Sequence, residues 1–334
     1  MNTGMPLSTV SYFGKLPSRG DFVRSADNHQ LMARLDRWAG GGVELLAQNV
    51  AWKTLYDQSP PMHFAFLGSR SRAAIAGHFL PSRDATGRRF PFLSAICLDA
   101  PQPVGFIRRS PLALARLWSS LARLGRQAMQ AADAGEPLRE LADSDTAVNS
   151  DPATYEASFV DFLEMQDIGA LQTLLRQSGH ARMNLHWVLP ALGLLMQPLL
   201  TSSAHAIDKA LALPLPRDPL YQPLVATWWM DLIGRFVERA DFELALLIKE
   251  GPGPEADDAP RLIVGFQGAD GGTLHAALDP QVADERIIRI DDAAWVEDQR
   301  AGDYALNRLA SYLERDALSL QSASRCFGET FLGT

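Results

Sequence analysis

The sequence predicts an α/β protein made of two α/β domains, each a small, mostly antiparallel or mixed sheet packed with helices in layers. The chain has 334 residues, which is long for one hydrophobic core. Strand-like runs and helical periodicities occur in both halves. Charge is uneven, because residues 1–150 hold 17 Lys and Arg against 12 Asp and Glu, whereas residues 151–334 hold 14 against 27. We therefore expect an N-terminal domain over 1–135, an acidic linker over 136–154, and a C-terminal domain with a helical first part over 155–334.

In the first half, short apolar runs bounded by turn residues predict strands. These runs cover 10–13, 63–67, 74–80 and 90–98. A polar turn separates the second run from the third, so we expect those two to form an antiparallel pair. Amphipathic helices are predicted over 28–49 and after an N-cap at Ser110, which precedes Pro111. Three glycines at 40–42 interrupt the first helix, so either it ends there or its backbone packs very close to a neighbour.

The second half begins with helical periodicity and then changes to strand-like runs. Helices are predicted over 155–163, 171–175, 185–200 and 224–239. Strands are predicted over 242–248, 262–266, 274–278 and 287–290. Two amphipathic helices, over 306–313 and 320–327, close the chain. The stretch 131–154 between the halves is small, acidic and poor in apolar residues, which is typical of a linker or surface loop.

Several classes of protein are excluded by composition. The most apolar window, 185–200, has sixteen residues and two prolines, whereas a membrane span needs about 20 apolar residues. The N-terminal stretch lacks the pattern of a secretory signal, so we expect a cytoplasmic protein without an integral membrane segment. Basic residues are mostly scattered arginine pairs, which argues against nucleic-acid binding. Two distant cysteines cannot form a disulfide framework or a CxxC site.

Motifs for catalysis or cofactor binding are absent from the sequence, so we expect no catalytic residue, no metal and no cofactor. None of the seven histidines has the HxxxH or HExxH spacing of a helical zinc pair. His63 and His78 fall on predicted neighbouring strands, where a satisfied or half-exposed histidine is a better interpretation than a ligand. GxSxG and GxxxxGK[ST] sequences are also missing.

The glycine-rich stretch 265–275, GFQGADGGTLH, is the strongest alternative to a non-enzymatic function. Such turns can hold phosphates or, with separated aspartates, metal ions. This alternative is a metal-dependent phosphatase or nucleotide-binding regulator centred on Asp270–Thr273. No second or third acidic motif is found near Asp257, Asp258, Asp291 or Asp292. A hairpin turn between two strands is therefore the favoured interpretation.

Two loops share the core LPSR followed by an aspartate. The first is GKLPSRGDF at 14–22, and the second contains LPSRD at 80–84. Each leaves a predicted strand through Leu-Pro and places an arginine near an aspartate. We expect the two loops to lie close together at one edge of the first domain, with Asp21 or Asp84 paired to Lys15, Arg83 or Arg88.

The segments SYFGKLPSRGDFVR (11–24), LDRW (35–38) and HFLPSRDATGRRFPF (78–92) resemble the N-terminal region of the TagF family, which is associated with bacterial type VI secretion. Leu35 stands where a tryptophan is usual. The resemblance covers about residues 10–130 and is looser beyond, as in long members with an extra C-terminal domain. The signature and candidate interface residues are Gly14, Lys15, Pro17, Arg19, Gly20, Asp21, Phe22, Pro81, Ser82, Arg83, Asp84, Gly87, Arg88, Phe90 and Pro91.

The resemblance implies a cytoplasmic, post-translational repressor of type VI secretion that acts by protein–protein interaction. Some members act by binding the forkhead-associated scaffold protein of that system. Glycines and prolines in the two loops can be explained by the turns that they make. Lys15, Arg19 and Arg88 are long cations that turns do not require, so the sequence favours an interface role for them.

Overall fold

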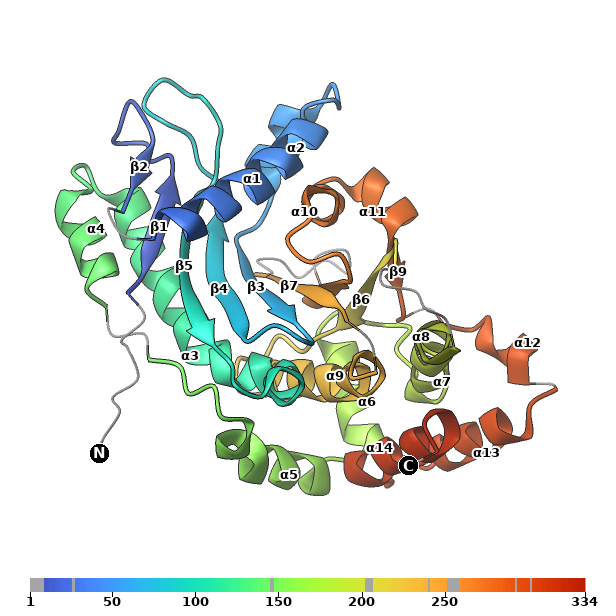
Figure 1. The fold of residues 1–334 in the computed structure, drawn as a ribbon. Helices are drawn as coiled ribbons and strands as arrows, with labels where there is room; N and C mark the ends of the chain where they lie inside the picture. Colours follow the sequence, from blue (N-terminus) through green and yellow to red (C-terminus); the bar gives the residue numbers. More distant parts are fainter. Residues whose placement is uncertain are drawn as a thin grey trace, which may run out of the picture.

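The fold is a nine-stranded sheet with helices on both faces in the described part of the chain (Figure 1). The computed structural model describes residues 9–25, 28–144, 147–201, 207–239, 241–250, 259–291, 293–300 and 302–333. The strands are β1 Ser11–Gly14, β2 Val23–Arg24, β3 Met62–Gly68, β4 Ala73–Leu80, β5 Phe92–Asp99, β6 Ala210–Pro214, β7 Glu243–Lys249, β8 Arg261–Gly265 and β9 Ile287–Arg289.

Strands of both halves of the chain belong to this one sheet, in the order β2-β1-β5-β4-β3-β7-β8-β6-β9. The halves meet where β3 pairs antiparallel with β7, from Met62 opposite Lys249 to Gly68 opposite Glu243. Neighbours are antiparallel except β6 and β9. The α/β class and the mostly antiparallel pairing are confirmed. The strands form one shared sheet instead of one small sheet for each half, because β7 covers the edge of β3 that β4 leaves unpaired.

Helices flank the sheet and fill the connections. They are α1 His29–Leu46, α2 Trp52–Gln58, α3 Pro103–Gln130, α4 Gly135–Ala142, the 3-10 helix η1 Pro152–Tyr155, α5 Glu156–Met165, α6 Ile168–Gln177, α7 Leu185–Met196, α8 Pro198–Thr201, α9 Tyr221–Val237, α10 Gly271–Leu278, α11 Pro280–Arg286, α12 Val296–Arg300, α13 Tyr304–Leu313 and α14 Leu320–Phe331. Helix α4 lies in the predicted linker and buries Leu138 and Leu141. The domain boundaries expected near 135 and 155 stay a prediction.

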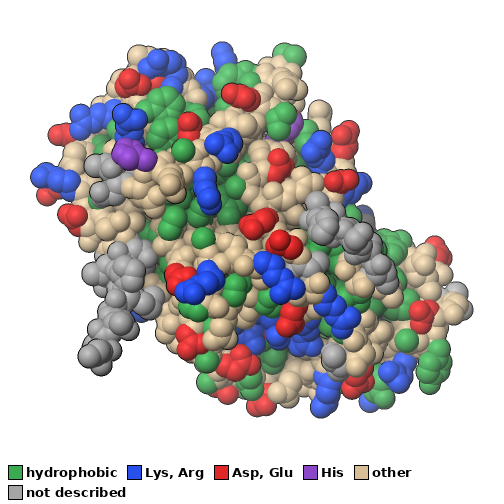
Figure 2. Space-filling model, viewed as in Figure 1, with side chains coloured by type: hydrophobic (Ala, Val, Ile, Leu, Met, Phe, Trp, Pro, Cys, Tyr) green, Lys and Arg blue, Asp and Glu red, His purple; other side chains and the backbone are tan. Residues whose placement is uncertain are grey.

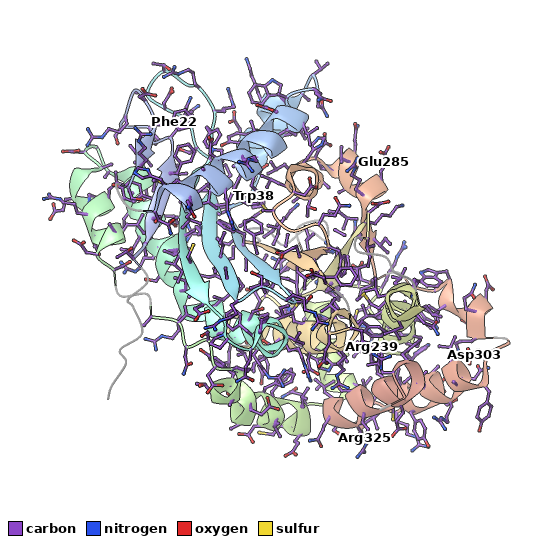
Figure 3. The ribbon with its side chains drawn as sticks, viewed as in Figure 1. Phe22, Trp38, Arg239, Glu285, Asp303 and Arg325 are labelled. Atoms are coloured by element: carbon purple, nitrogen blue, oxygen red, sulfur yellow. The ribbon has the colours of Figure 1, made fainter. Side chains whose placement is uncertain are left out.

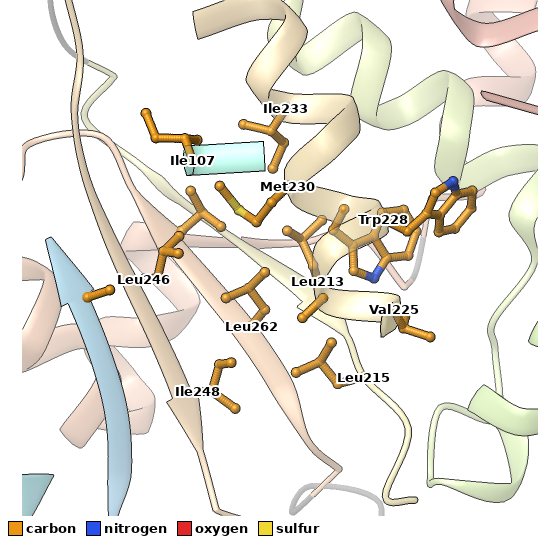
Figure 4. Packing of buried hydrophobic residues seen from close by; sticks show 14 of the residues in the cluster. Ile107, Leu213, Leu215, Val225, Trp228, Met230, Ile233, Leu246, Ile248 and Leu262 are labelled. Atoms are coloured by element: carbon orange, nitrogen blue, oxygen red, sulfur yellow. The ribbon is translucent and has the colours of Figure 1, made fainter. Parts of the chain in front are cut away.

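A large apolar core lies between the sheet and helices α3 and α9. On α9, Met230 and Ile233 are fully buried and face side chains of β6, β7 and β8 (Figure 4). Trp228 is also fully buried, but it points toward α14, where its Nε1 donates to Ser324 Oγ at 2.8 Å. A second core on the other face packs Trp38 of α1 against Phe64 and Phe66 of β3. Since each face is covered by helices from both halves, neither half buries its apolar surface alone.

Helix α3 begins earlier than predicted, at Pro103, and the expected N-cap Ser110 lies inside it. Pro111 has no N–H to donate to the carbonyl of Ile107, four residues back. Ser110 Oγ donates to that carbonyl instead, at 2.9 Å, and the next amide, that of Leu112, donates to Thr227 Oγ1 on α9 at 3.1 Å. The lost helical bond is thus replaced, and the proline is tolerated.

The glycines at 40–42 do not end helix α1, and two of them, Gly41 and Gly42, lie in close contact with α10. A Cβ on Gly42 would lie 2.6 Å from Leu274 Cδ2, and one on Gly271 would lie 2.9 Å from the carbonyl carbon of Gly41. The strand predicted over 274–278 is wrong, since these residues belong to α10. Leu274, Ala277 and Leu278 are buried at the i, i+3, i+4 spacing of a helix face, a pattern that a short apolar run shares with a strand.

Candidate functional site

The candidate site is the pair of loops that carry the shared LPSR core. The first loop, residues 15–22, connects β1 to β2, and the second loop, residues 81–91, connects β4 to β5. They lie side by side at the upper left of Figure 1. Ser82 Oγ donates to Lys15 O at 2.6 Å, and Ala85 N donates to Arg19 O at 2.8 Å. The prediction that the two loops lie together is confirmed.

Asp84 is the centre of this arrangement. Its side chain is completely buried, and the carboxylate lies 3.0 Å from Lys15 Nζ and 2.7 Å from Arg88 Nε. It also accepts hydrogen bonds from Thr86 N, Thr86 Oγ1 and Arg88 N. Burial alone would raise the pKa of Asp84, but the hydrogen bonds from Thr86, Arg88 and Lys15 outweigh it and hold the pKa well below its usual range. The carboxylate therefore stays ionised and holds both loops in place.

Arg88 links the two loops from outside. Its guanidinium donates to Asp84 Oδ2 through Nε and to Gly20 O through Nη2, at 2.7 Å in both cases. The Arg88 side chain is still 61% exposed. Asp21, the matching aspartate of the first loop, is exposed, and its Oδ1 accepts from Phe22 N at 2.8 Å. Of the two aspartates, Asp84 makes the predicted ion pairs.

At two positions of the site, the backbone conformation or the close approach of a neighbouring chain segment favours glycine. Gly14 has a φ of 140°, and a Cβ there would lie 2.0 Å from the carbonyl oxygen of Pro91. Gly87 has a φ of 84°, in the left-handed region that favours glycine. At Gly20, by contrast, a Cβ would meet nothing within 4 Å.

An aromatic cluster supports the same edge of the molecule. Phe22 stacks on Phe13 with ring centroids 5.2 Å apart, and its ring is 5.0 Å from that of Phe90. The ammonium of Lys15 lies 5.0 Å from the centroid of Phe22, a cation–π contact. Phe22, which is labelled in Figure 3, is nevertheless 42% exposed. An exposed aromatic ring on a braced loop is suited to contact another protein.

The structure divides the signature residues into an inner and an outer set. Most of the inner set is buried, and it comprises Gly14, Lys15, Ser82, Asp84, Phe90, Pro91 and the half-buried Pro81. The outer set is exposed and comprises Pro17, Arg19, Gly20, Asp21, Phe22, Arg83, Gly87 and Arg88. Lys15, for which the sequence favoured an interface role, lies in the inner set at 6% exposure.

Residues outside the two loops complete the site. Tyr56 of α2 is buried, accepts from Ser82 N at 3.0 Å and donates to Ser82 O at 3.1 Å. Burial raises the pKa of Tyr56 above its usual value, so the hydroxyl stays protonated. Asp133 pairs with Arg19 at 2.8 Å. These partners were missed because they are remote in sequence and carry no motif.

The Asp270–Thr273 stretch forms the start of helix α10 instead of the expected hairpin turn. Asp270 is the N-cap, and its Oδ2 accepts from Thr273 N at 3.0 Å. The Asp270 carboxylate therefore already accepts the hydrogen bond of a backbone N–H that could otherwise bind an anion at the start of the helix. Asp291, considered as a partner, instead pairs with Arg261 at 2.8 Å. Asp257, Asp258 and Asp292 lie outside the described residues.

Surface properties add two observations. Figure 2 shows cationic and anionic side chains intermingled on the face in view. Among the described helices, none combines the length and apolar character needed to cross a membrane.

Fold and site together define an α/β protein that presents two loops locked by a buried ion pair. Residues 11–144 match the family model described as "TagF N-terminal domain, Type VI secretion system-associated". Residues 11–144 therefore form a domain of that type VI secretion-associated family, which confirms the resemblance for this part of the chain. The matched region contains both loops and ends in the stretch predicted as a linker.

Other comparisons are less extensive. The chain is similar to the crystal structure of PA0076 from Pseudomonas aeruginosa PAO1, with 25% sequence identity and a TM-score of 0.35. The similarity covers 42% of this chain and 64% of that chain, which is less than two thirds of its length. No curated protein matches this chain.

Proposed function

We propose that this protein is a post-translational repressor of a type VI secretion system that acts in the cytoplasm by binding a protein partner and not by catalysis. The match of residues 11–144 to a family associated with type VI secretion carries the proposal. The proposed partner is the forkhead-associated scaffold protein of the same system, a partner that the TagF resemblance suggests. Repression by sequestration needs a stable surface and no reactive group.

The outer set of the two loops is the proposed binding surface. Its arginines are exposed, while the inner set fixes the backbone beneath them through the Asp84 ion pairs. A surface that is ordered before binding loses less conformational entropy on association. Phe22 would supply an apolar anchor, and Arg19 and Arg83 would attract acidic groups of the partner.

A pull-down and a titration with the purified scaffold protein test this proposal. We expect the double charge reversal Arg19→Glu/Arg83→Glu to weaken binding at least about tenfold and to release secretion in cells. Both side chains are exposed, so the melting temperature should stay near that of the wild type. The matched control is Arg315→Glu/Arg325→Glu, which changes an exposed arginine between α13 and α14 and an exposed arginine on α14. Arg325 lies far from Phe22 in Figure 3.

Each outcome decides one part of the proposal. Failure of the wild-type protein to bind the scaffold would eliminate that partner. Equal binding by the wild type and the Arg19→Glu/Arg83→Glu variant would eliminate the loop surface. Loss of binding in the control variant as well would move the interface to the C-terminal helices.

The enzymatic alternative at Asp270–Thr273 gains no support, because the Asp270 carboxylate is used as a helix cap. Thermal-shift measurements with Mg²⁺, ATP and GTP test it directly. We expect no rise in melting temperature. A reproducible rise that is lost in Asp270→Ala would revive the alternative.

A further inference from the structure

Three neighbouring strands bring two histidines and a glutamate together on the face of the sheet that α3 covers. His63 of β3 and His78 of β4 lie directly opposite each other in the antiparallel register. Glu250 follows β7, and its amide donates to Pro61 O at 2.9 Å, which places it beside the start of β3. Ile248 pairs with His63, so Glu250 continues the same face two residues further on.

The geometry of this cluster resembles a set of metal ligands. Glu250 Oε1 lies 3.6 Å from His63 Nε2 and 3.7 Å from His78 Nε2. In a tetrahedral site with bonds of about 2.0–2.1 Å, ligand atoms are about 3.3 Å apart. Glu250 Oε1 would thus have to approach each Nε2 by only a few tenths of an ångström, and one ligand atom from each of the three residues lies within 4.8 Å of the others.

His78 Nε2 gives an independent indication of a missing ligand. The His78 side chain is completely buried, and this nitrogen has no hydrogen-bond partner among the described residues. A buried polar atom without a partner costs free energy, about 1–3 kcal/mol for a typical group. Coordination of an ion would satisfy it.

We propose that His63, His78 and Glu250 bind one divalent transition-metal ion of the zinc class through the two Nε2 atoms and Oε1. Two imidazoles and a carboxylate are suited to such an ion, and solvent would supply a fourth ligand. An ion and a solvent molecule can reach the cluster from outside, since the side chains of His63 and Glu250 are 14% and 24% exposed.

Neighbouring side chains orient the proposed ligands. Arg126 of α3 pairs with Glu250 Oε2, the carboxylate oxygen that the ion would not use. Trp118 stacks on His63 with ring centroids 5.5 Å apart, and its Nε1 donates to Phe64 O at 3.1 Å. Contacts of this kind fix the orientation of ligands in metal sites. The ion would join β3 and β4 to the end of β7, and so connect the two halves of the sheet.

Proton positions change when the ion binds. The two Nδ1 atoms are 3.0 Å apart, so without metal one ring donates to the other through Nδ1–H, and the second ring carries its proton on Nε2. Coordination through both Nε2 atoms requires both rings to be Nδ1–H tautomers. The second proton moves from Nε2 to Nδ1 through solvent, no net proton is released, and the Nδ1 atoms separate. Burial, with a contribution from Arg126, lowers the pKa of His63 to about 3, so its ring is neutral near pH 7.

Titration of the chelator-treated full chain with Zn²⁺, by calorimetry and by metal analysis after dialysis, tests the site. We expect one ion per chain and a melting temperature raised by about 4 °C or more at a hundredfold excess over the Kd. Co²⁺ in the same site should give the visible absorption of tetrahedral coordination. His63→Gln and Glu250→Gln should each weaken binding at least about tenfold.

The matched control is His29→Gln, which removes an exposed histidine outside the cluster and should leave binding unchanged. Circular dichroism of the metal-free variants separates a loss of ligand from a loss of fold. Absence of Zn²⁺ binding at micromolar concentration in the wild type would overturn the proposal and leave the cluster as a hydrogen-bonded group. Equal binding by the wild type, His63→Gln and Glu250→Gln would overturn it as well.

Discussion

The two halves of the sheet are connected in different ways. In the first half, β3, β4 and β5 are consecutive in the chain and lie side by side, and β1 adds to β5. In the second half, β6 lies between β8 and β9, although all of α9 and β7 separate it from β8 in the chain. The first half thus forms mostly through local hairpins, and the second depends on distant pairings. Local pairings can be inferred from turn residues, whereas distant ones need the whole fold.

Separation of the halves should have the largest effect. A fragment of residues 1–150 exposes the edge of β3 over Met62–Gly68 and the surface of α3 that packs on α9. We expect this fragment to aggregate and to lack a cooperative urea transition, because an unpaired apolar edge associates with other chains. Size-exclusion chromatography and near-ultraviolet circular dichroism provide the measurement.

Addition of the complementary fragment 151–334 is the control, and it should restore a soluble complex. A monomeric, cooperatively unfolding fragment 1–150 would instead support an independent N-terminal domain with a boundary near residue 135.

Acidic pH should destabilise the folded protein at the junction between the halves, where β3 pairs with β7. Burial lowers the pKa of His63 to about 3, with a contribution from Arg126, and burial also lowers the pKa of His78, with contributions from His63 and Arg126. In the unfolded chain these rings take up protons near pH 6.5. The unfolded state therefore binds more protons below pH 6.5, so the free energy of unfolding is retained above that pH and falls toward pH 3.

For the metal-free protein we expect the free energy of unfolding to fall by on the order of a few kcal/mol between pH 6.5 and pH 4. Urea denaturation at a series of pH values measures it. In the His63→Gln variant, the free energy of unfolding should fall less steeply with decreasing pH over this range. Glu250 and Arg126 are still present beside the site in this variant. Identical slopes for the two proteins would show that the acid-sensitive groups lie elsewhere.

A smaller effect is expected where helices of the two halves touch. Gly42→Ala places a Cβ 2.6 Å from Leu274 Cδ2, so α1 and α10 must shift apart, and we expect a loss of about 1–2 kcal/mol in the free energy of unfolding. Gly40→Ala on the same helix meets nothing within 4 Å and should be neutral or stabilising by up to about 1 kcal/mol. Similar urea midpoints for the two variants would mean that the helix contact contributes little.

Much of the first half could be predicted from the sequence. The strands near 10–13, 63–67, 74–80 and 90–98 are present, because each is a short apolar run between turn residues. Proximity of the two loops was also predictable. The roles of Lys15 and Arg88 within them were not, since burial of one cation and exposure of the other depend on how the loops fold around Asp84.

The errors share a physical cause. The segment 274–278 is a helix because Asp270 caps it and α1 offers a glycine surface to pack on. Strand β6 was not predicted, since its five residues become a strand only between β8 and β9. In each case tertiary contacts decided between local conformations of similar free energy.

By itself, the sequence determined the α/β class, the local hairpins and the family signature of the two loops. These features depend on turn chemistry and on the spacing of apolar residues, which act over a few residues. Only the tertiary structure decided that both halves share one sheet, that Asp84 joins the loops, and that Glu250 lies beside His63 and His78. Such contacts join residues up to about 190 positions apart, and their free energy comes from burial that exists only when the whole chain is folded.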